Sequence, residues 1–319
     1  MNTGTKSVYA LDIGGSSVKH GIVEVSATSG RITEKGDPAL IHSRSFDDLL
    51  HSVRRLVTAY EERVRPNGFD LAICTTGSVT QNGVVLKAGH FEGYENVDWA
   101  ALLMPDNAGL TSVHVVNDGR ASTWAEFVSQ QDSDSLLHVV VGTGVGAGLV
   151  SQGRPLLGEH GFAGYLGHMK VAPAGDVVCS CGNKGCIETV ASGPAIVRHY
   201  HDAGGDQAIG DFPAVVSAAQ QGDTAAEEAL EVAGTWLGLG ISYAMNLLNP
   251  GLVTIGGGVV ESTTSTDAGF GLYADAAIRE AQAKAHRRVA TATIRPGSFG
   301  NEGGMIGAAL FSLFKESEN

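Results

Sequence analysis

The chain has 319 residues, with 21 lysines and arginines against 34 aspartates and glutamates, so its formal net charge is −13. This charge argues against nucleic acid or an anionic membrane as a general partner, because both bind positively charged surfaces. A hydrophobic fraction of 43% with 17% charged residues indicates a globular protein. At ~150 residues per domain, the length predicts two domains or one large one.

Neither a membrane anchor nor an export signal is predicted. The most apolar stretch, Val139–Val150, holds four glycines and is shorter than the ~20 apolar residues of a membrane-spanning helix. The N-terminal sequence reaches the pair Gly14-Gly15 too early to contain the apolar core of a signal peptide. We therefore expect a cytoplasmic protein without a membrane partner.

In chain order, the first part of the sequence predicts two strands joined by a glycine turn, then an amphipathic helix and two more strands. The helix is the clearest element, because its apolar residues recur at helical spacing and fall on one face. The strands are expected at Val8–Asp12, Val18–Val25, Phe69–Cys74 and Val113–Asn117, and the helix at Phe46–Val64.

The second part repeats the strand, glycine turn and strand, so we place a domain boundary near residue 117. Residues 1–116 would form an N-terminal lobe, joined by a C-terminal helix at 303–319, and residues 117–302 a C-terminal lobe. Polar loops are expected at Gly204–Asp211 and Glu261–Asp267. The remaining helices are expected at Arg120–Ser129, Glu227–Leu248 and Met305–Phe314, and the strands at Leu136–Val141, Gly146–Ser151, Leu252–Ile255 and Ala292–Arg295.

Both glycine turns can bind an anion. Glycines let successive N–H groups converge on one phosphate. The first turn contains Gly14, Gly15 and Ser16 and follows Asp12, whose carboxylate can hold Mg²⁺. The second, Gly142-Thr143-Gly144, also follows a strand but lacks the Gly-Lys-Ser/Thr ending of common nucleotide loops. Either turn, taken alone, could be an ordinary hairpin turn. The presence of one such turn in each half of the chain predicts a nucleotide held between two lobes.

A compact set of metal ligands follows the second turn. His168, Cys179, Cys181 and Cys186 supply one nitrogen and three sulfurs, a closed tetrahedral set that suits structural zinc. The alternative is a group of reduced surface thiols.

One carboxylate follows the carboxyl end of a predicted strand, a position where catalytic groups can lie. Asp118 follows the strand that ends at Asn117, and sites in α/β proteins gather at the carboxyl ends of strands. It could accept the proton of a hydroxyl nucleophile, or it could cap the N-terminus of the following helix.

Together these motifs resemble the ROK family of sugar kinases, repressors and open reading frames, over nearly the whole chain. Cys179–Glu188 is the most specific match, since it is similar to the family's zinc signature. The other similar segments are the phosphate motifs at 12–16 and 141–146, the Glu-x-Gly-His motif at 164–168, and the nucleotide-side and closing segments at 256–258 and 300–307.

The resemblance implies an α/β fold of the two-lobed, actin-like ATPase (hexokinase) type with ribonuclease-H-like halves. It implies transfer of the γ-phosphoryl group of ATP, with Mg²⁺, to a hexose hydroxyl, usually the 6-hydroxyl. Structural Zn²⁺ and assembly into a dimer or tetramer are implied as well.

The roles carried over from the family can be assigned residue by residue. Asp118 would be the catalytic base. The sugar would contact Gly77, Asn117, Asp118, Tyr165, His168 and Glu188. The nucleotide would contact Asp12, Gly14, Gly15, Ser16, Gly142, Thr143, Gly144, Gly257 and Gly258. His168, Cys179, Cys181 and Cys186 would bind the metal.

Three departures from the family pattern fall on the sugar side. Tyr165 replaces the glutamate of Glu-x-Gly-His, His90 replaces an asparagine, and Thr76 replaces a proline. A tyrosine cannot offer a bidentate carboxylate contact, so a sugar other than glucose becomes an alternative. Tyr165 could instead point away while His90 supplies the contact.

Other functions remain open beside a glucokinase-like enzyme. An N-acetylmannosamine-type kinase is one, because such members also lack that glutamate and Trp124–Phe127 is similar to them. A non-catalytic, sugar-sensing regulator is another, although family repressors carry a DNA-binding motif before the first phosphate turn and only eleven residues precede Asp12 here. The zinc loop argues against a polymerising actin-like ATPase.

Overall fold

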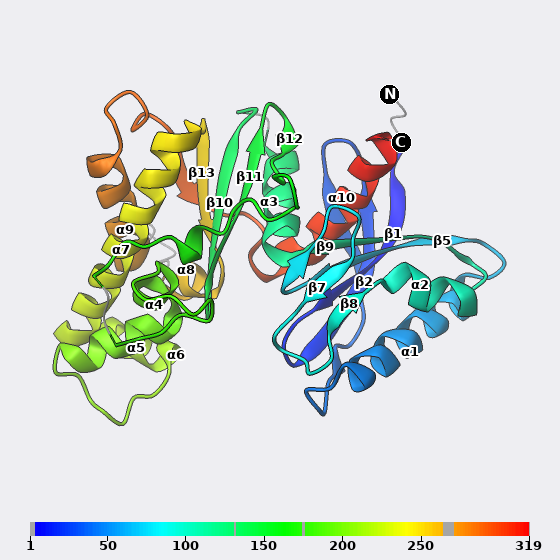
Figure 1. Ribbon diagram of the computed structural model, residues 1–319, viewed down its shortest axis with the longest axis horizontal. Helices are drawn as coiled ribbons and strands as arrows, with labels where there is room; N and C mark the ends of the chain where they lie inside the picture. The colour runs from blue at the N-terminus through cyan, green and yellow to red at the C-terminus, as the bar shows by residue number, and fades with distance from the viewer. Residues whose placement is uncertain (1–3, 131, 174–175, 264–270, 319) are drawn as a thin grey trace. The chain divides into compact units, whose positions relative to one another are not determined.

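The computed structural model describes residues 4–130, 132–173, 176–263 and 271–318 (Figure 1). They divide into two compact units: described residues within 4–130, 155–163 and 302–318 form the first, and those within 132–154 and 164–301 form the second. This division differs from the expected boundary at 117, because the helix that follows residue 117 packs within the first unit. There Trp124 lies 4.9 Å from Phe314, between ring centroids.

The first unit is built on a mixed sheet in the order β3-β2-β1-β5-β9, with β4 paired to β2. The predicted hairpin of β1 and β2 is antiparallel, whereas β1, β5 and β9 are parallel. Their carboxyl ends therefore meet at one edge. The strands are β1 (Lys6–Ile13), β2 (Ser17–Val25), β3 (Gly30–Lys35), β4 (Ala39–Leu40), β5 (Phe69–Thr75) and β9 (Leu110–Asn117).

Helices α1 (Phe46–Val64) and α10 (Gly303–Glu318) pack on this sheet. Helix α1 has the expected bounds, since Ser45 caps its first turn by accepting from the Asp47 N–H at 3.1 Å. Its Val53 and Val57 are fully buried in one cluster with Leu11 and Leu71. Alternate strand residues point to the opposite face, where α10 lies against α3 (Asp118–Ser129), β1 and β5.

A small second sheet completes this unit and was not predicted. Strands β6 (Ser78–Val79), β7 (Val85–Lys87) and β8 (Glu95–Val97) pair in antiparallel order, and α2 (Trp99–Leu103) and the 3-10 turn η1 (Met104–Asp106) follow. These strands are too short to show a hydrophobic period in the sequence.

The second unit repeats the central pattern with the sheet order β12-β11-β10-β13-β14. The predicted hairpin of β10 and β11 is antiparallel, and β10, β13 and β14 are parallel. Figure 1 shows these strands from green to orange. They are β10 (Leu136–Val141), β11 (Val145–Ser151), β12 (Arg154–Pro155), β13 (Leu252–Gly256) and β14 (Thr293–Pro296).

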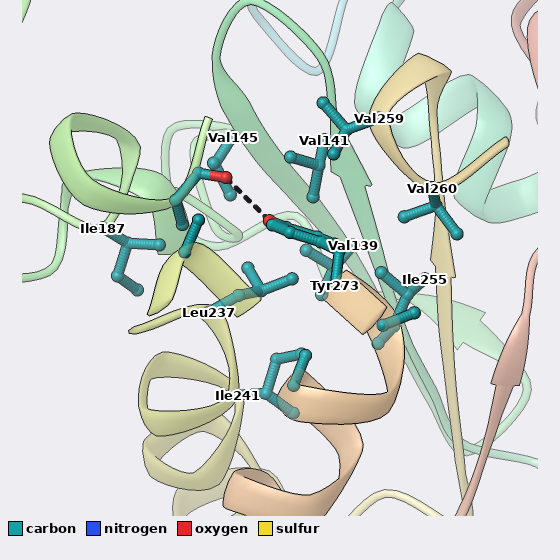
Figure 2. Packing of buried hydrophobic residues seen from close by; sticks show 14 of the residues in the cluster. Val139, Val141, Val145, Ile187, Leu237, Ile241, Ile255, Val259, Val260 and Tyr273 are labelled. Carbon is teal, nitrogen blue, oxygen red and sulfur yellow. Dashed lines mark hydrogen bonds between the residues drawn. The ribbon is translucent and has the colours of Figure 1, made fainter. Parts of the chain in front are cut away.

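Helices pack against this sheet, and the hydrophobic core of the unit lies between them and the strands. Figure 2 shows Val139 and Ile255, from β10 and β13, packed with Leu237 and Ile241 of α7. Tyr273 of α9 donates a hydrogen bond to the Ala191 carbonyl at 2.7 Å. The elements are η2 (Leu166–His168), α4 (Glu188–Ala191), α5 (Gly193–Asp202), α6 (Phe212–Gln220), α7 (Thr224–Leu248), α8 (Gly258–Thr263), α9 (Gly271–Lys284) and η3 (Gly300–Glu302).

The chain contains 44 glycines, and close backbone contact explains some of them. A Cβ at Gly234 or Gly238 of α7 would collide with carbonyl oxygens of α9. A Cβ at Gly307 of α10 would collide with the carbonyl oxygen of Ala121 in α3. Within the described ranges, no helix is both long and apolar enough to cross a membrane.

Several predicted ends need correction. Helix α7 begins at Thr224, before the expected Glu227, because Asp223 accepts from the N–H groups of Ala225 and Ala226. Of the polar loop expected at Glu261–Asp267, residues 261–263 form the last half of α8, and residues 264–267 lie outside the described residues.

Candidate functional site

In the first unit, Asp118 stands at the junction of β9 and α3. Asn117, the last residue of β9, is the N-cap of α3, since its Oδ1 accepts from the Arg120 N–H at 3.2 Å. The cap expected as an alternative role of Asp118 is therefore provided by its neighbour. The two hydrogens of the Asn117 amide go to the Gly77 carbonyl at 3.0 Å and to Asp118 Oδ1 at 2.7 Å.

The carboxylate of Asp118 is held through one oxygen. Oδ1 accepts from the Gly119 N–H at 2.8 Å as well as from Asn117. Burial of the carboxyl group, and after it the charge of Asp12, raise the pKa of Asp118, although the residue as a whole is exposed at the surface. Among the described residues, no hydrogen bond reaches Oδ2, so this oxygen can accept a proton from a ligand.

Asp12 lies at the end of β1 on the face that α10 covers. Its carboxylate pairs with Lys19 at 3.4 Å, and Cys74 is its partner in the register of β1 and β5. Burial raises the pKa of Asp12 and of the Cys74 thiol. A Cβ at Gly304 would lie 2.9 Å from Cys74 Sγ and 3.6 Å from Asp12 Oδ1, so glycine lets α10 begin directly against this pair.

The first glycine turn closes through a hydrogen bond from the Gly14 N–H to the Ser17 carbonyl at 3.0 Å. Gly15 and Ser16 are exposed and can meet a ligand. His90 lies beside this turn, because a Cβ at Gly15 would lie 3.3 Å from its Nδ1. Gly77 takes a φ of +91° in the turn that Asn117 holds. The first unit thus brings these predicted residues together with Asp12 and Asp118.

The second glycine turn closes in the same way, with the Gly142 N–H donating to the Gly144 carbonyl at 2.9 Å. Thr143 at its tip is exposed. Gly257 lies beside the same strand end, since a Cβ there would come within 2.5 Å of the Val141 carbonyl oxygen, and its φ is +93°. Gly258 begins α8.

The four predicted metal ligands gather in the second unit. The ligand atoms of His168, Cys179, Cys181 and Cys186 all lie within 4.8 Å of one another. His168 Nδ1 lies 3.3 Å from Cys179 Sγ, and Cys181 Sγ lies 3.7 Å from Cys186 Sγ. The expected gathering of these residues is confirmed.

The chemistry of this cluster fits zinc. Three sulfurs and one ring nitrogen form a closed tetrahedral set, and a zinc ion would deprotonate the thiols. Hydrogen bonds from Asn183 already lower the pKa of Cys181 to about 7, whereas burial raises the pKa of Cys186. Because four protein ligands leave no open position, the ion would stabilise the loop and would not polarise a substrate.

Two predicted sugar contacts lie against this cluster. The ring of Tyr165 stacks on that of His168 with centroids 5.6 Å apart, and Tyr165 is 48% exposed. Glu188, the first residue of α4, accepts from the Ser180 hydroxyl at 3.1 Å and from the Val145 N–H at 3.2 Å. The carboxylate therefore bridges the metal-ligand loop and the second glycine turn.

Residues outside the predicted set also shape these sites. Cys74 and Gly304 lie beside Asp12, His90 lies beside the first turn, and Ser180 donates a hydrogen bond to Glu188. Of these residues, Gly304 was signalled by the closing family motif that contains it. His90 was noticed only because it replaces the asparagine of the family pattern. Cys74 and Ser180 gave none, because each acts through a pairing that only the fold creates.

The fold and these sites define the chain as an α/β protein of the two-lobed, actin-like type. A family model described as "ROK family" matches residues 8–316, and the chain belongs to this family. The ROK family glucokinase from Streptomyces griseus, solved in complex with glucose and AMPPNP, matches with a TM-score of 0.76 and 23% identity, over 95% of this chain and 98% of that one.

Curated relatives include both enzymes and regulators. The chain is 34% identical over 191 residues to an N-acetylmannosamine kinase of Citrobacter koseri, covering 60% of this chain and 63% of the kinase. It is 30% identical over 224 residues to the DNA-binding transcriptional dual regulator NagC of Escherichia coli, covering 67% of this chain and 54% of the regulator. The chain thus spans about half the length of that regulator.

Proposed function

We propose that this chain is an ATP-dependent sugar kinase that transfers the γ-phosphoryl group to a hexose hydroxyl, the 6-hydroxyl. The arrangement of Asp118 carries the proposal. Asn117 and Gly119 orient the carboxylate through Oδ1, and Oδ2 is left to accept the proton of a substrate hydroxyl. A helix cap alone does not require this orientation, because Asn117 already caps α3.

The reaction needs one proton transfer and one displacement. The hydroxyl oxygen of the sugar attacks the γ-phosphorus, the bond from this phosphorus to the β,γ-bridging oxygen breaks, and Asp118 Oδ2 takes the hydroxyl proton. The products are the sugar phosphate and ADP. Phosphoryl transfer depends mainly on positioning and charge stabilisation, so the N–H groups of the two glycine turns would bind phosphate oxygens.

Mg²⁺ fits the first turn by the chemistry of its donors. Asp12 offers carboxylate oxygens, which this ion prefers, and is only 18% exposed. When bound, the ion would neutralise charge on the phosphates. Lys19, paired with Asp12, adds a second positive group on this side of the turn.

The identity of the sugar depends on Tyr165. Its exposed ring on His168 offers an apolar face and one hydroxyl, which suits the methyl of an N-acetyl group better than a glutamate would. The similarity to an N-acetylmannosamine kinase supports an N-acetylhexosamine as the second candidate substrate, beside the glucose found with the Streptomyces enzyme.

A coupled assay of ADP release against a panel of hexoses and N-acetylhexosamines tests the proposal. We expect sugar-dependent ADP release with at least one member. Sugar binding measured by calorimetry without ADP release for any sugar would instead support a sugar-sensing regulator.

A further inference from the structure

We propose that Ser180 and Glu188 couple metal binding at the His168/Cys179/Cys181/Cys186 cluster to nucleotide binding at the second glycine turn. The proposal rests on the proposed function, because it takes that turn to bind nucleotide phosphates. It adds a role for the metal loop beyond local stability: the occupied loop sets the affinity for the nucleotide.

The metal-side half of this link is a hydrogen bond from the loop itself. Ser180 lies between two metal ligands in the sequence, Cys179 and Cys181, so its position is set by the geometry of the ligands around the ion. Its hydroxyl donates to Glu188 Oε1 at 3.1 Å. Cys179 Sγ lies 3.6 Å from the same oxygen, but a metal-bound thiolate has no proton to donate.

The nucleotide-side half is a contact with the backbone of the turn. Glu188 Oε2 accepts from the Val145 N–H at 3.2 Å, and Val145 is the buried first residue of β11. A Cβ at Gly144 would lie 2.5 Å from Glu188 Oε2. The carboxylate is therefore packed against the turn, and a shift of either one requires a shift of the other.

The backbone that carries Glu188 is fixed to the core. Ile187 is fully buried and donates its N–H to the Met169 carbonyl at 2.9 Å. At the other end of α4, Ala191 accepts from Tyr273 of α9 (Figure 2). With α4 held at both ends, the hydrogen bonds of the Glu188 side chain give the route from Ser180 to the turn, and its two oxygens still have lone pairs for a sugar hydroxyl.

Coupling between two binding sites is reciprocal, so it can be measured from either side. If the metal improves nucleotide affinity by some factor, the nucleotide must improve metal affinity by the same factor. Coupling factors of about 5 to 150 are typical, and we expect a factor of about 10 for one hydrogen-bonded bridge of this kind.

The first experiment measures the affinity for Mg²⁺–AMPPNP by calorimetry, with zinc-loaded and chelator-stripped protein. For the wild type we expect binding about tenfold weaker after stripping, within the usual range of coupling factors. In Ser180→Ala the zinc ligands and Glu188 remain, yet loaded and stripped protein should bind AMPPNP equally within about twofold, because the bridge is cut. Ser217→Ala removes an exposed hydroxyl of α6 that contacts Gln221 and should keep the wild-type difference.

The second experiment does not require folded, metal-free protein. A chromophoric chelator competes for zinc from the loaded protein, with and without AMPPNP. AMPPNP should increase zinc affinity in the wild type and in Ser217→Ala by the factor found by calorimetry, and should leave Ser180→Ala unchanged.

The outcomes separate the link from the function. Loaded wild-type protein that fails to bind AMPPNP contradicts the proposed function. AMPPNP binding that is indifferent to zinc, or full coupling in Ser180→Ala, overturns the link while the function stands.

Discussion

Replacing Asp118 by asparagine removes the proposed proton acceptor with little change in shape. The oxygen of the amide can still accept from the Gly119 N–H and from the Asn117 amide, as Oδ1 does in the wild type at 2.8 and 2.7 Å. The amide nitrogen then occupies the place of Oδ2, the oxygen that no described residue binds. The change is therefore confined to the side that would face the substrate.

The expected loss follows from the role of a general base. Removal of such a group lowers the rate by ~10²–10⁴, which corresponds to about 3–5 kcal/mol of transition-state stabilisation at ~1.4 kcal/mol per tenfold. The stability of Asp118→Asn should be equal to or higher than that of the wild type. Because burial raises the pKa of Asp118, the folded state loses stability as the pH rises above the unfolded pKa near 3.8, and the uncharged amide escapes this cost at neutral pH.

The assay compares kcat by ADP release and Tm by calorimetry for the wild type and Asp118→Asn. Asp98→Asn is the matched control, since Asp98 caps α2 by accepting from the Ala101 N–H at 3.2 Å and asparagine caps equally well. We expect Asp118→Asn to lose at least a hundredfold in kcat with an equal or higher Tm. A variant that keeps more than about a tenth of the wild-type rate would refute the role of Asp118, because loss of a general base costs more.

Three further predictions concern the second unit. Cys181→Ser should lower zinc content from about one ion per chain, measured by metal analysis, whereas Cys74→Ser, outside the cluster, should keep it. Burial lowers the pKa of His138 to about 4, so the free energy of unfolding should fall by up to about 3 kcal/mol between pH 6.5 and 4, because only the unfolded state gains a proton there. Urea unfolding of His138→Gln should lack this pH-dependent loss. The same change with pH in the wild type and the variant would contradict the prediction. Tyr165→Glu should raise kcat/KM for glucose relative to N-acetylmannosamine, and an unchanged ratio would exclude Tyr165 from specificity.

Local patterns predicted the parts of the fold that are local in origin. Helix α1 combines helical spacing of apolar residues with a serine cap, and its bounds were predicted to the residue. The two strand–glycine–strand hairpins and the metal cluster were found for the same reason, since their residues are close in sequence. The roles of the predicted site residues in catalysis and binding stay predictions.

What sequence reasoning missed depends on tertiary structure. Asn117 and Asp118 are both good N-cap residues, and only the structure shows that Asn117 takes the cap. The position of Cys74 beside Asp12 follows from the register of β1 and β5. The approach of Gly304 to the same pair follows from the docking of α10. The periodicity of hydrophobic residues in the sequence predicts neither the register of two strands nor the docking of a helix.

Asn117 and Glu188 serve the two units in a similar way, and this affects how their variants should be interpreted. Each was expected to bind sugar, yet each already uses side-chain atoms to fix backbone beside a functional group: Asn117 at Gly77 and α3, and Glu188 at Val145. Removing either side chain would disturb a turn as well as a sugar contact. A rise in KM for sugar alone therefore does not identify a ligand. Only a variant that weakens sugar binding while leaving AMPPNP affinity intact, and for Glu188 zinc affinity as well, can assign direct contact, because the structural role predicts that these affinities change together.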